Sequence, residues 1–477
     1  MISLNQKNFI LLFLLINFCI CERALIFVYE HVRHGARGPS SGYKAILNNG
    51  VDEYGIKWGT DGELTQIGKR QHYYLGVRNR LKYSNLINFK EYNPKEILIH
   101  STDYNRTHQS VLSELYGMYE GLREAELKDD EPKFTMVNDK YMKDNNTNLF
   151  SQIHNELSYI GNKVNSESFP VFNIHKFPDK RIFLVDDCIK LNNYRDEKNG
   201  PQVKKFFDEF DSKFLKAFKK IMNKNEDFFH LYDTMKSYTD HFICAYDNKK
   251  DLSHLEKEEL DLDAFYNFSK RFYGHFIFNY FVDEYTSGLE ETHLMQDVIG
   301  YMIRRINNLN EVTYKAPKMV IDSGHDSTVG PMARFLSSSL NVKYHEFCEF
   351  ACNIYLELYK EDDGKYTVDY YLDDELIFKE KEFYKEFKEP IESHYWNDTY
   401  MDEFCGKKED SDIDNSSKLS DYSNILFAIS IVSSILFLIF ITSTIVIFRR
   451  LKKLQKKLQE NPLLNEETEG AELPALT

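Results

Sequence analysis

The residues best suited to chemistry stand in one heptapeptide, Arg33-His34-Gly35-Ala36-Arg37-Gly38-Pro39. A guanidinium group presents a planar fork of donors that pairs with two oxygens of a phosphate or carboxylate. A neutral imidazole between two such groups is an available nucleophile for an electrophile that they hold. Gly35 lets the backbone approach an anion closely. The pattern predicts an anion site with a nucleophilic histidine, and the competing interpretation is a surface ion cluster.

Two other polar clusters could complete this site. The segment 101–107 (STDYNRT) supplies a further arginine, Arg106, and His325 is followed directly by Asp326. An adjacent imidazole and carboxyl group can stabilise an anion and donate a proton. An isolated His-Asp pair is more often an ordinary surface pair, but the company of the first cluster favours a functional role.

A short apolar run precedes each cluster, at residues 24–32, 96–100 and 318–322. Such runs, with helices between them, are typical of buried parallel strands in an α/β sheet. Ligands of open α/β sheets bind at the carboxyl ends of the strands. The three clusters come directly after the predicted strands, so we expect them to meet at one edge.

Helical periodicity fills the spaces between these runs. One apolar face follows the second run and another follows the third, formed by Val111, Leu112, Leu115, Met118 and Tyr119, and by Val329, Met332, Ala333 and Leu336. Residues 120–300 lack further strand-and-loop units, and we interpret them as a helical insertion that caps the ligand end of the sheet. Its aromatic stripe is interpreted as core packing and consists of Phe206, Phe210, Phe214 and Phe218.

The two ends of the chain carry apolar blocks. Residues 9–20 follow Lys7 and resemble the core of a secretory signal peptide, with an uncleaved anchor as the alternative. Residues 425–448 are uncharged and long enough to cross the ~30 Å hydrocarbon core. Six basic residues follow within 449–457, which predicts a cytoplasmic tail and a single-pass type I membrane protein.

Composition limits the class of protein. The 477 residues are 42% hydrophobic and 28% charged, which excludes a collagen-like or wholly disordered chain. The net charge of −15 argues against a nucleic-acid partner. No Asp/His set has convincing metal-ligand spacing, so no cofactor is predicted. Five cysteines lie beyond the predicted signal peptide, which allows two disulfides and leaves their pairing open.

Four blocks together resemble one known family, the histidine acid phosphatases of the histidine phosphatase superfamily. They are the R-H-G-x-R-x-P motif at 33–39, a G-x-L-T-x-x-G-x-x-Q region at 62–71 with Leu75-Gly76 after it, the S-x-D-x-x-R-T segment at 101–107, and Ser-Gly-His-Asp at 323–326. The resemblance covers roughly residues 24–405. It implies a mixed, mainly parallel sheet flanked by helices, with a phosphoglycerate-mutase-like, Rossmann-like core.

The resemblance also implies a role for each site residue. His34 would attack phosphorus, and Asp326 would protonate the leaving alkoxide. The equatorial oxygens would be held by Arg33, Arg37, Arg106 and His325. The implied activity is acid phosphatase on phosphomonoesters without a metal. The alternatives are a narrower phosphatase for phytate, other inositol phosphates or lysophosphatidate, and a non-enzymatic receptor ectodomain on the same fold.

The family further suggests disulfides Cys188–Cys405 and Cys244–Cys352, with Cys348 free or taking the place of Cys352. Sequons mark Asn145, Asn267, Asn397 and Asn415 as glycosylation candidates. Asn105 is also a sequon, but a glycan there would crowd Arg106, so we expect it to stay unmodified.

We therefore expect the ectodomain in a lysosome-like compartment or at the cell surface, with a homodimer as an open alternative. The expected organisation is a signal peptide at 1–21, a catalytic domain of 22–119 and 301–405, a helical cap at 120–300, a stalk at 406–424, a transmembrane helix at 425–448 and a tail at 449–477.

Overall fold

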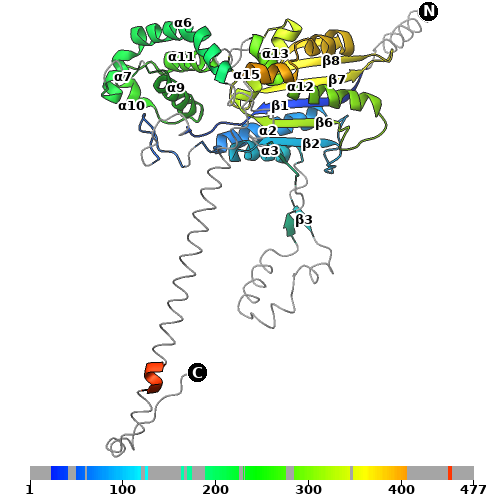
Figure 1. Cartoon of the computed structure of the whole chain (residues 1–477), viewed down its shortest axis with the longest axis horizontal. Helices are drawn as coiled ribbons and strands as arrows, with labels where there is room; N and C mark the ends of the chain where they lie inside the picture. Colours follow the sequence, from blue (N-terminus) through cyan, green and yellow to red (C-terminus); the bar gives the residue numbers. More distant parts are fainter. Residues whose placement is uncertain are drawn as a thin grey trace, which may run out of the picture. The chain divides into compact units, whose positions relative to one another are not determined.

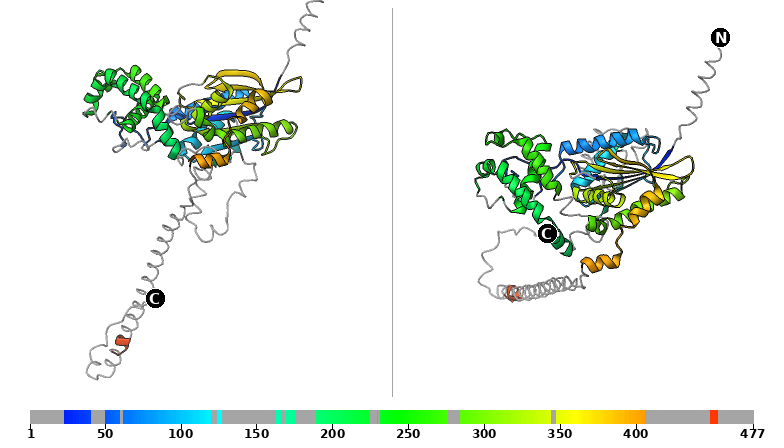
Figure 2. Two further views of the ribbon diagram at one scale, coloured as in Figure 1. Left: turned by 45° about the horizontal axis from the view of Figure 1, so that its top comes forward. Right: turned by 90° about the horizontal axis from the view of Figure 1, so that it is seen from above.

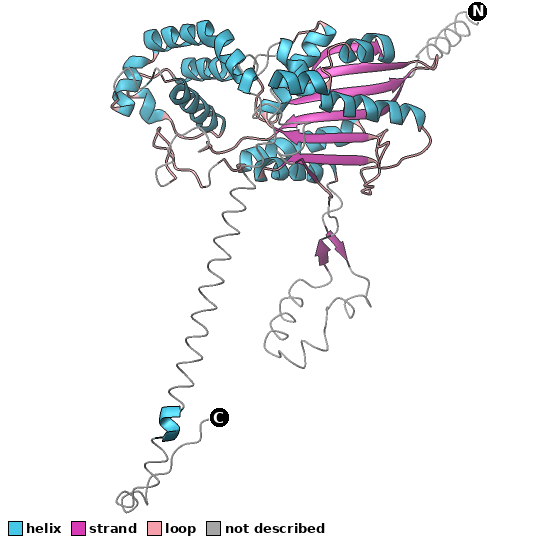
Figure 3. Ribbon diagram, viewed as in Figure 1, coloured by secondary structure: helices cyan, strands magenta, loops and turns pink. Residues whose placement is uncertain are grey.

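A seven-stranded mixed sheet lies at the centre of the described chain, with helices on both of its faces (Figures 1 and 3). The computed structural model describes residues 23–40, 50–59, 62–119, 124–126, 163–165, 169–174, 189–224, 229, 231–275, 284–343, 347–405 and 449–453. Residues 1–406 form one compact unit and residues 407–477 form a second.

Several sequence-based predictions lie outside the described residues. They are the signal peptide at 1–21, the stalk at 406–424, the membrane helix at 425–448, Cys188, Asn145 and Asn415. Within the residues that are described, no helix is both long and apolar enough to cross a membrane.

The three predicted strands form as expected. The sheet runs in the order β5-β2-β6-β1-β7-β8-β9, with strands β1 (Ala24–Arg33), β2 (Ile97–Thr102), β5 (Phe172–Ile174), β6 (Met319–Gly324), β7 (Asn353–Lys360), β8 (Tyr366–Leu372) and β9 (Glu375–Glu382). A separate two-stranded ribbon pairs β3 (Glu124–Glu126) with β4 (Lys163–Asn165).

The sheet is mixed, but the expectation that it is mainly parallel was wrong. In the described sheet, β5, β2, β6 and β1 pair in parallel, whereas β7, β8 and β9 add antiparallel pairs beside β1. Short loops explain the β7–β8 and β8–β9 pairs, because short hairpin loops can join only antiparallel strands. Asp373 and Asp374 both have positive φ between β8 and β9, the conformation of a two-residue hairpin loop.

The register brings the predicted clusters together. Arg33 at the end of β1 lies opposite Gly324 at the end of β6. Ser101 near the end of β2 lies opposite Ser323 of β6. The carboxyl ends of the three strands therefore meet at one edge, which confirms the expected juxtaposition of the polar clusters.

Alternating residues of β1 divide the core into two layers. Val28 and Val32 pack with Val111 and Leu115 of α3, on the face that α2 and α3 cover. Phe27 and Tyr29 belong to the larger core on the opposite face, which includes α12 and α13. The covering helices are α2 (Gln66–Lys82), α3 (Asn105–Met118), α12 (Glu284–Asn307) and α13 (Asp326–Leu340).

The described residues between β5 and α12 are helical and gather beyond the end of the sheet toward which β1 runs (Figures 1 and 2). The predicted insertion at 120–300 also contains β3, β4 and β5, and β5 joins the main sheet, so the expectation that it holds no further strands was wrong. The four phenylalanines of the aromatic stripe are buried in its core. Its helices are α6 (Ile189–Lys213), α7 (Leu215–Met222), α9 (Tyr232–Asp247), α10 (Ser253–Glu256) and α11 (Leu262–Gly274). After β9 come the π-helical turn η6 (Phe383–Lys388), α14 (Glu389–Glu392) and α15 (Asp398–Cys405).

Glycines let α2 and α3 approach closely beneath the site. A Cβ atom on Gly76 of α2 would stand 1.9 Å from the carbonyl oxygen of Glu114, and one on Gly117 of α3 would stand 2.2 Å from the carbonyl oxygen of Tyr73. These neighbours are backbone atoms of packed helices and cannot move alone. The helix pair tolerates no side chain at either position.

We predict that Gly76→Ala lowers the free energy of unfolding by about 2 kcal/mol or more, because the added methyl forces the two helices apart. The matched control is Gly300→Ala in α12, where the atoms nearest to a Cβ would be the guanidinium end of Arg304, with its Nη1 3.0 Å away; it should be neutral or stabilise by up to about 1 kcal/mol. Denaturant unfolding of both variants gives the comparison. Equal stability of Gly76→Ala and wild type would contradict the close approach.

Candidate active site

His34 sits directly beyond β1 and is only 2% exposed. Its Nδ1 lies 2.9 Å from the carbonyl oxygen of Gly35. A carbonyl can only accept, so Nδ1 carries the proton and donates this hydrogen bond. In the neutral ring, Nε2 then holds the lone pair and is the atom available for nucleophilic attack.

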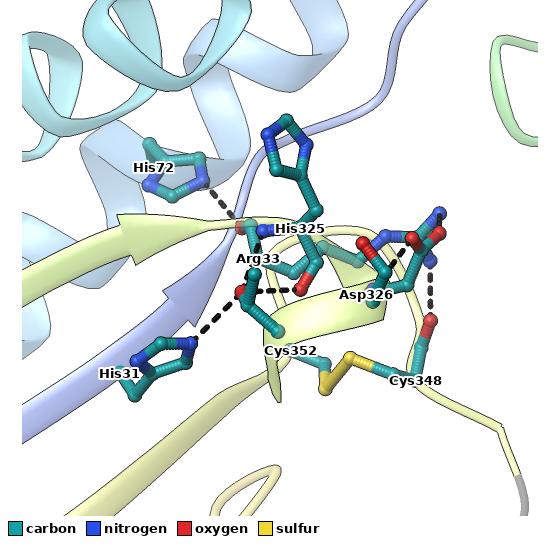
Figure 4. The surroundings of a disulfide bond; sticks show 9 residues. His31, Arg33, His72, His325, Asp326, Cys348 and Cys352 are labelled. Carbon is teal, nitrogen blue, oxygen red and sulfur yellow. Dashed lines mark hydrogen bonds and ion pairs between the residues drawn. A yellow bond between two sulfur atoms is a disulfide. The ribbon is translucent and has the colours of Figure 1, made fainter. Parts of the chain in front are cut away.

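Arg33 lies at the end of β1 between two protein partners (Figure 4). Its Nη2 is 2.7 Å from Oδ2 of Asp326, and its Nη1 donates to the carbonyl oxygen of Cys348. The guanidinium carbon also lies 4.3 Å from the centre of the Phe350 ring. Among the described residues, Nε of Arg33 is buried with no hydrogen-bond partner. The N–H of Nε thus remains available for an anion.

Arg37 is 3% exposed and is held in the same manner by the helical segment. Its Nη2 lies 2.8 Å from Oδ1 of Asp240 on α9, and its Nη1 lies 3.2 Å from Oδ2 of the same carboxylate. Nη1 also donates to the carbonyl oxygen of Gly38 at 3.0 Å. Nε of Arg37, like that of Arg33, is buried and has no partner in the described part of the chain.

Arg106 and His325 come together from α3 and the start of α13. Nη2 of Arg106 lies 3.4 Å from Nδ1 of His325, and Nε2 of His325 lies 2.9 Å from Oγ1 of Thr102. The His325 ring packs edge-on against the rings of His34 and Tyr104, with centroids 5.4 and 4.9 Å away. His325 is therefore fixed beside the predicted nucleophile.

The surrounding charges keep both histidines neutral. Burial, followed by the charges of Arg106, His325, Arg33 and Arg37, lowers the pKa of His34 well below its ordinary value. Burial and the three arginines likewise lower the pKa of His325. An unprotonated His34 is the form that can attack an electrophile, so the cation cluster preserves the nucleophile in acidic solution.

Asp326 is the first residue of α13, where the helix dipole favours a negative charge. Besides Arg33, it contacts Tyr273 of α11, whose hydroxyl is 3.4 Å from Oδ2. The backbone N–H of Ser327 donates to Oδ1 at 2.8 Å. The carboxyl group is thus held in the same cluster of side chains as His34.

The second sequence block, around residues 62–71, holds the loop that carries the heptapeptide. Thr65 caps α2 and donates its backbone N–H to the carbonyl oxygen of Ala36 at 2.9 Å. Oε1 of Gln71 accepts from the N–H of Ala36 at 2.8 Å. A Cβ on Gly35 would stand 2.4 Å from the carbonyl oxygen of Gly68, so this close approach requires glycine. The block positions the loop.

A buried polar network lies beneath Arg33. Nε2 of His72 is 3.0 Å from the carbonyl oxygen of Arg33 and therefore donates to it. Nδ1 of the neutral His72 must then accept, and its partner, 3.1 Å away, is Oε2 of Glu114. Glu114 can donate only when protonated. Burial raises the pKa of Glu114 to about 7, in agreement with this geometry.

The cysteine pairing differs from the expectation. Cys348 bonds to Cys352, and Cys244 is a free, buried thiol, so the predicted Cys244–Cys352 bridge and the free Cys348 were wrong. Cys348 and Cys352 face each other across a short turn, with Cα atoms 5.6 Å apart, whereas Cys244 lies 3.3 Å from Nη1 of Arg37. Cys405 is disulfide-bonded, and its predicted partner Cys188 lies outside the described residues.

The six predicted site residues converge, but the residues that hold them in place were not predicted. Asp240 and Asn248 of the α9 region, Tyr273 of α11 and Phe350 all contact the arginines, Asp326 or their loop. The sequence signal that could have indicated the α9 residues is the four-residue spacing of Asp240, Cys244 and Asn248.

In the described chain, no group of three or more His, Cys, Asp or Glu side chains is placed to hold a metal ion. Asn267 and Asn397 are exposed.

Comparison with known proteins gives a consistent picture. The sequence matches the description "Histidine phosphatase superfamily (branch 2)" over residues 24–373. The lysosomal acid phosphatase of Xenopus laevis is 27% identical over 371 residues, which are 74% of this chain and 70% of that protein. The lysosomal acid phosphatase of Homo sapiens is 23% identical over 369 residues, with coverages of 74% and 71%. The structure of Klebsiella sp. ASR1 phytase aligns with a TM-score of 0.47 at 12% identity, covering 74% of this chain and 83% of that one.

The network beneath Arg33 predicts a pH-dependent stability. The pKa of Glu114 is about 7 when folded and near 4.5 in the unfolded chain. The stabilisation from its protonated form is therefore present below about pH 4.5 and is lost as the pH rises through 7; the shift corresponds to about 3 kcal/mol. Glu114→Gln keeps a donor for His72 without the titration. Its free energy of unfolding relative to wild type should rise by about 2 kcal/mol between pH 5 and pH 8. Parallel pH curves for the two proteins would contradict a protonated Glu114.

Proposed function

The chain belongs to branch 2 of the histidine phosphatase superfamily, and on that premise we propose that it hydrolyses phosphomonoesters at acid pH through a phosphohistidine on His34. The observation that carries this proposal is the orientation of His34. Its Nδ1 is committed to the carbonyl oxygen of Gly35, which leaves Nε2 as the nucleophile. The names of the curated relatives, lysosomal acid phosphatases, support the same reaction.

The arginines would bind the transferring phosphoryl group. Phosphoryl transfer depends mainly on positioning and on stabilising negative charge spread over the equatorial oxygens. The buried Nε donors of Arg33 and Arg37 suit that task, because their Nη groups are already engaged by protein. Arg106 would bind a further oxygen from the start of α3.

His325 would join these donors once phosphate arrives. Burial and three arginines lower the pKa of His325 and keep the ring neutral. A bound phosphate dianion would offset the arginine charges and favour the protonated ring. His325 could then donate to a phosphate oxygen in exchange for its contact with Arg106.

Asp326 would act as the general acid. The attack of Nε2 on phosphorus breaks the bond to the ester oxygen, and Asp326 would donate its proton to that leaving alkoxide. Water would then attack the phosphohistidine, with Asp326 as the base that takes up its proton, and release inorganic phosphate. Asp326 must carry a proton to begin this cycle, and a phosphate bound to Arg33 would release the carboxyl group from its ion pair with that arginine so that it can take one up.

The natural substrate is proposed only as a class. Broad activity on small phosphomonoesters agrees with the acid phosphatase names of the relatives. The acidic chain, with a net charge of −15, gives no support to a highly anionic substrate such as phytate. We further propose a secretory-pathway or lysosomal location, and the type I topology with a span at 425–448 remains a prediction.

We predict that acid phosphatase activity requires His34 as the phosphoryl acceptor. Rapid mixing with a ³²P-labelled monoester, followed by denaturation in base, should trap a base-stable and acid-labile phosphoenzyme whose label maps to His34. His34→Ala should form none and should lose at least about 10³-fold in kcat/KM. Label on another residue, or wild-type turnover by His34→Ala, would overturn the mechanism.

The loss of activity on replacing Asp326 should be larger for poorer leaving groups. For Asp326→Asn, the loss in kcat/KM, which reports the steps up to departure of the leaving group, should be about 10²-fold or more with an alkyl phosphate, because an alkoxide needs protonation. With p-nitrophenyl phosphate, whose leaving group is a weak base, the loss should be clearly smaller. Equal losses on both substrates would exclude Asp326 as the acid.

A further inference from the structure

The structure assigns a positioning function to one face of α9. We propose that Asp240, together with Cys244 and Asn248, holds Arg37 in the orientation that presents its Nε to the phosphoryl group, and that turnover depends on this contact. The inference rests on the proposed phosphatase function and extends it to residues of the helical segment.

Residues of this face contact Arg37 from its guanidinium group to its backbone. The Asp240 carboxylate accepts hydrogen bonds from both Nη atoms, at 2.8 and 3.2 Å. Sγ of Cys244 lies 3.3 Å from Nη1. Nδ2 of Asn248 donates to the carbonyl oxygen of Arg37 at 3.0 Å. The three residues are spaced by four, so they lie along one stripe of the helix and its C-terminal cap.

Asn248 also joins this stripe to the loop-holding block. Its Oδ1 accepts from the Thr65 hydroxyl at 2.6 Å, and the same hydroxyl lies 2.9 Å from the carbonyl oxygen of Ala36. The backbone before and at Arg37 is therefore fixed from two sides. A guanidinium on a fixed backbone, with both Nη atoms bound to Asp240, keeps Nε and the second N–H of Nη2 as donors for a ligand.

Electrostatic interactions keep the ion pair of Asp240 and Arg37 charged at acidic pH. Burial alone would raise the pKa of Asp240, but the charge of Arg37 outweighs burial and the pKa lies below its ordinary value. The Cys244 thiol stays neutral because burial, followed by the charge of Asp240, raises its pKa well above the usual range. A charged carboxylate and a neutral thiol can therefore hold the guanidinium at the acidic pH of the proposed reaction.

Two simpler explanations make different predictions. If Asp240 served only to neutralise Arg37, its removal would increase the positive charge at the site and tighten phosphate binding. If it served only to dock α9, a neighbouring contact of the same helix would matter equally. That neighbour exists, since Nδ1 of His241 lies 2.6 Å from Oε2 of Glu53, and neither residue contacts Arg37.

The test compares Asp240→Asn with Glu53→Gln in the full chain. The readouts are kcat and KM on p-nitrophenyl phosphate at acid pH, and the competitive inhibition constant of inorganic phosphate. Asp240→Asn is expected to lose about 10²-fold in kcat/KM, the scale for a catalytic group displaced by about 1 Å. Its phosphate inhibition constant should rise at least about tenfold, whereas Glu53→Gln should stay within about threefold of wild type.

A double-variant cycle separates positioning from folding. In an Arg37→Ala background, Asp240→Asn should change kcat/KM by less than about threefold, because there is no guanidinium left to orient. Asp240→Glu keeps the charge and moves it by one methylene, so it secures a folded protein if Asp240→Asn is unstable. It should still lose at least about tenfold in kcat/KM, with an unchanged far-UV circular dichroism spectrum.

The outcomes are decisive in each direction. Tighter or unchanged phosphate binding in Asp240→Asn would overturn the inference, as would additive losses in the cycle or full activity of Asp240→Glu. Equal losses in Glu53→Gln would assign the effect to docking of α9. Inactivity of the wild-type protein on every phosphomonoester would instead refute the proposed function itself.

Discussion

The structure depends on one constraint, which is that two arginine side chains are buried beside two histidines. Arg33 and Arg37 are 1% and 3% exposed, and a buried charge is strongly destabilising unless it is paired. Asp326 and Asp240 supply the two pairs, from α13 and α9. The chain must therefore bring a helix from each side of the site to the loop after β1. Burial, followed by the positive charge of the arginines, lowers the pKa of His34 and of His325 and keeps both rings neutral.

This constraint explains why the helical segment supplies residues to the site and does not only cover it. Its α9 provides the counter-charge for Arg37, and its α11 places the Tyr273 hydroxyl beside Asp326. The α/β core alone would leave Arg37 without a buried partner. The site is consequently shared between the sheet edge and the helical segment, although the heptapeptide and the His-Asp pair both lie on the core.

Much of the core could be predicted from the sequence, because short apolar runs indicate buried strands and the polar clusters mark the ends of those strands. β1, β2 and β6 appear where expected, and register brings Arg33, Gly324 and Ser101 to one edge. A mixed sheet was expected, but the extent of its antiparallel half was underestimated. The β8–β9 pair, for example, depends on turn geometry at Asp373 and Asp374 rather than on hydrophobic pattern.

The partners of the site could not be predicted for a related reason. Asp240 lies far from Arg37 in the sequence, in a segment rich in acidic and basic residues. Nothing in the sequence distinguishes it from the other aspartates of that segment as the partner of Arg37. The pairing of Cys348 with Cys352 was misjudged because it depends on how the turn between them folds. Glu114 appears on a helix as an ordinary acid, and only its contact with His72 shows that it is protonated.

The most direct test of the central claim is a crystal structure of the protein with orthovanadate, which mimics the transferring phosphoryl group. We predict vanadium bonded to Nε2 of His34, with Nδ1 still donating to the carbonyl oxygen of Gly35 and with Nε of Arg33 and of Arg37 facing the equatorial oxygens. Vanadate bonded through Nδ1, or bound away from these arginines, would contradict the proposed mechanism.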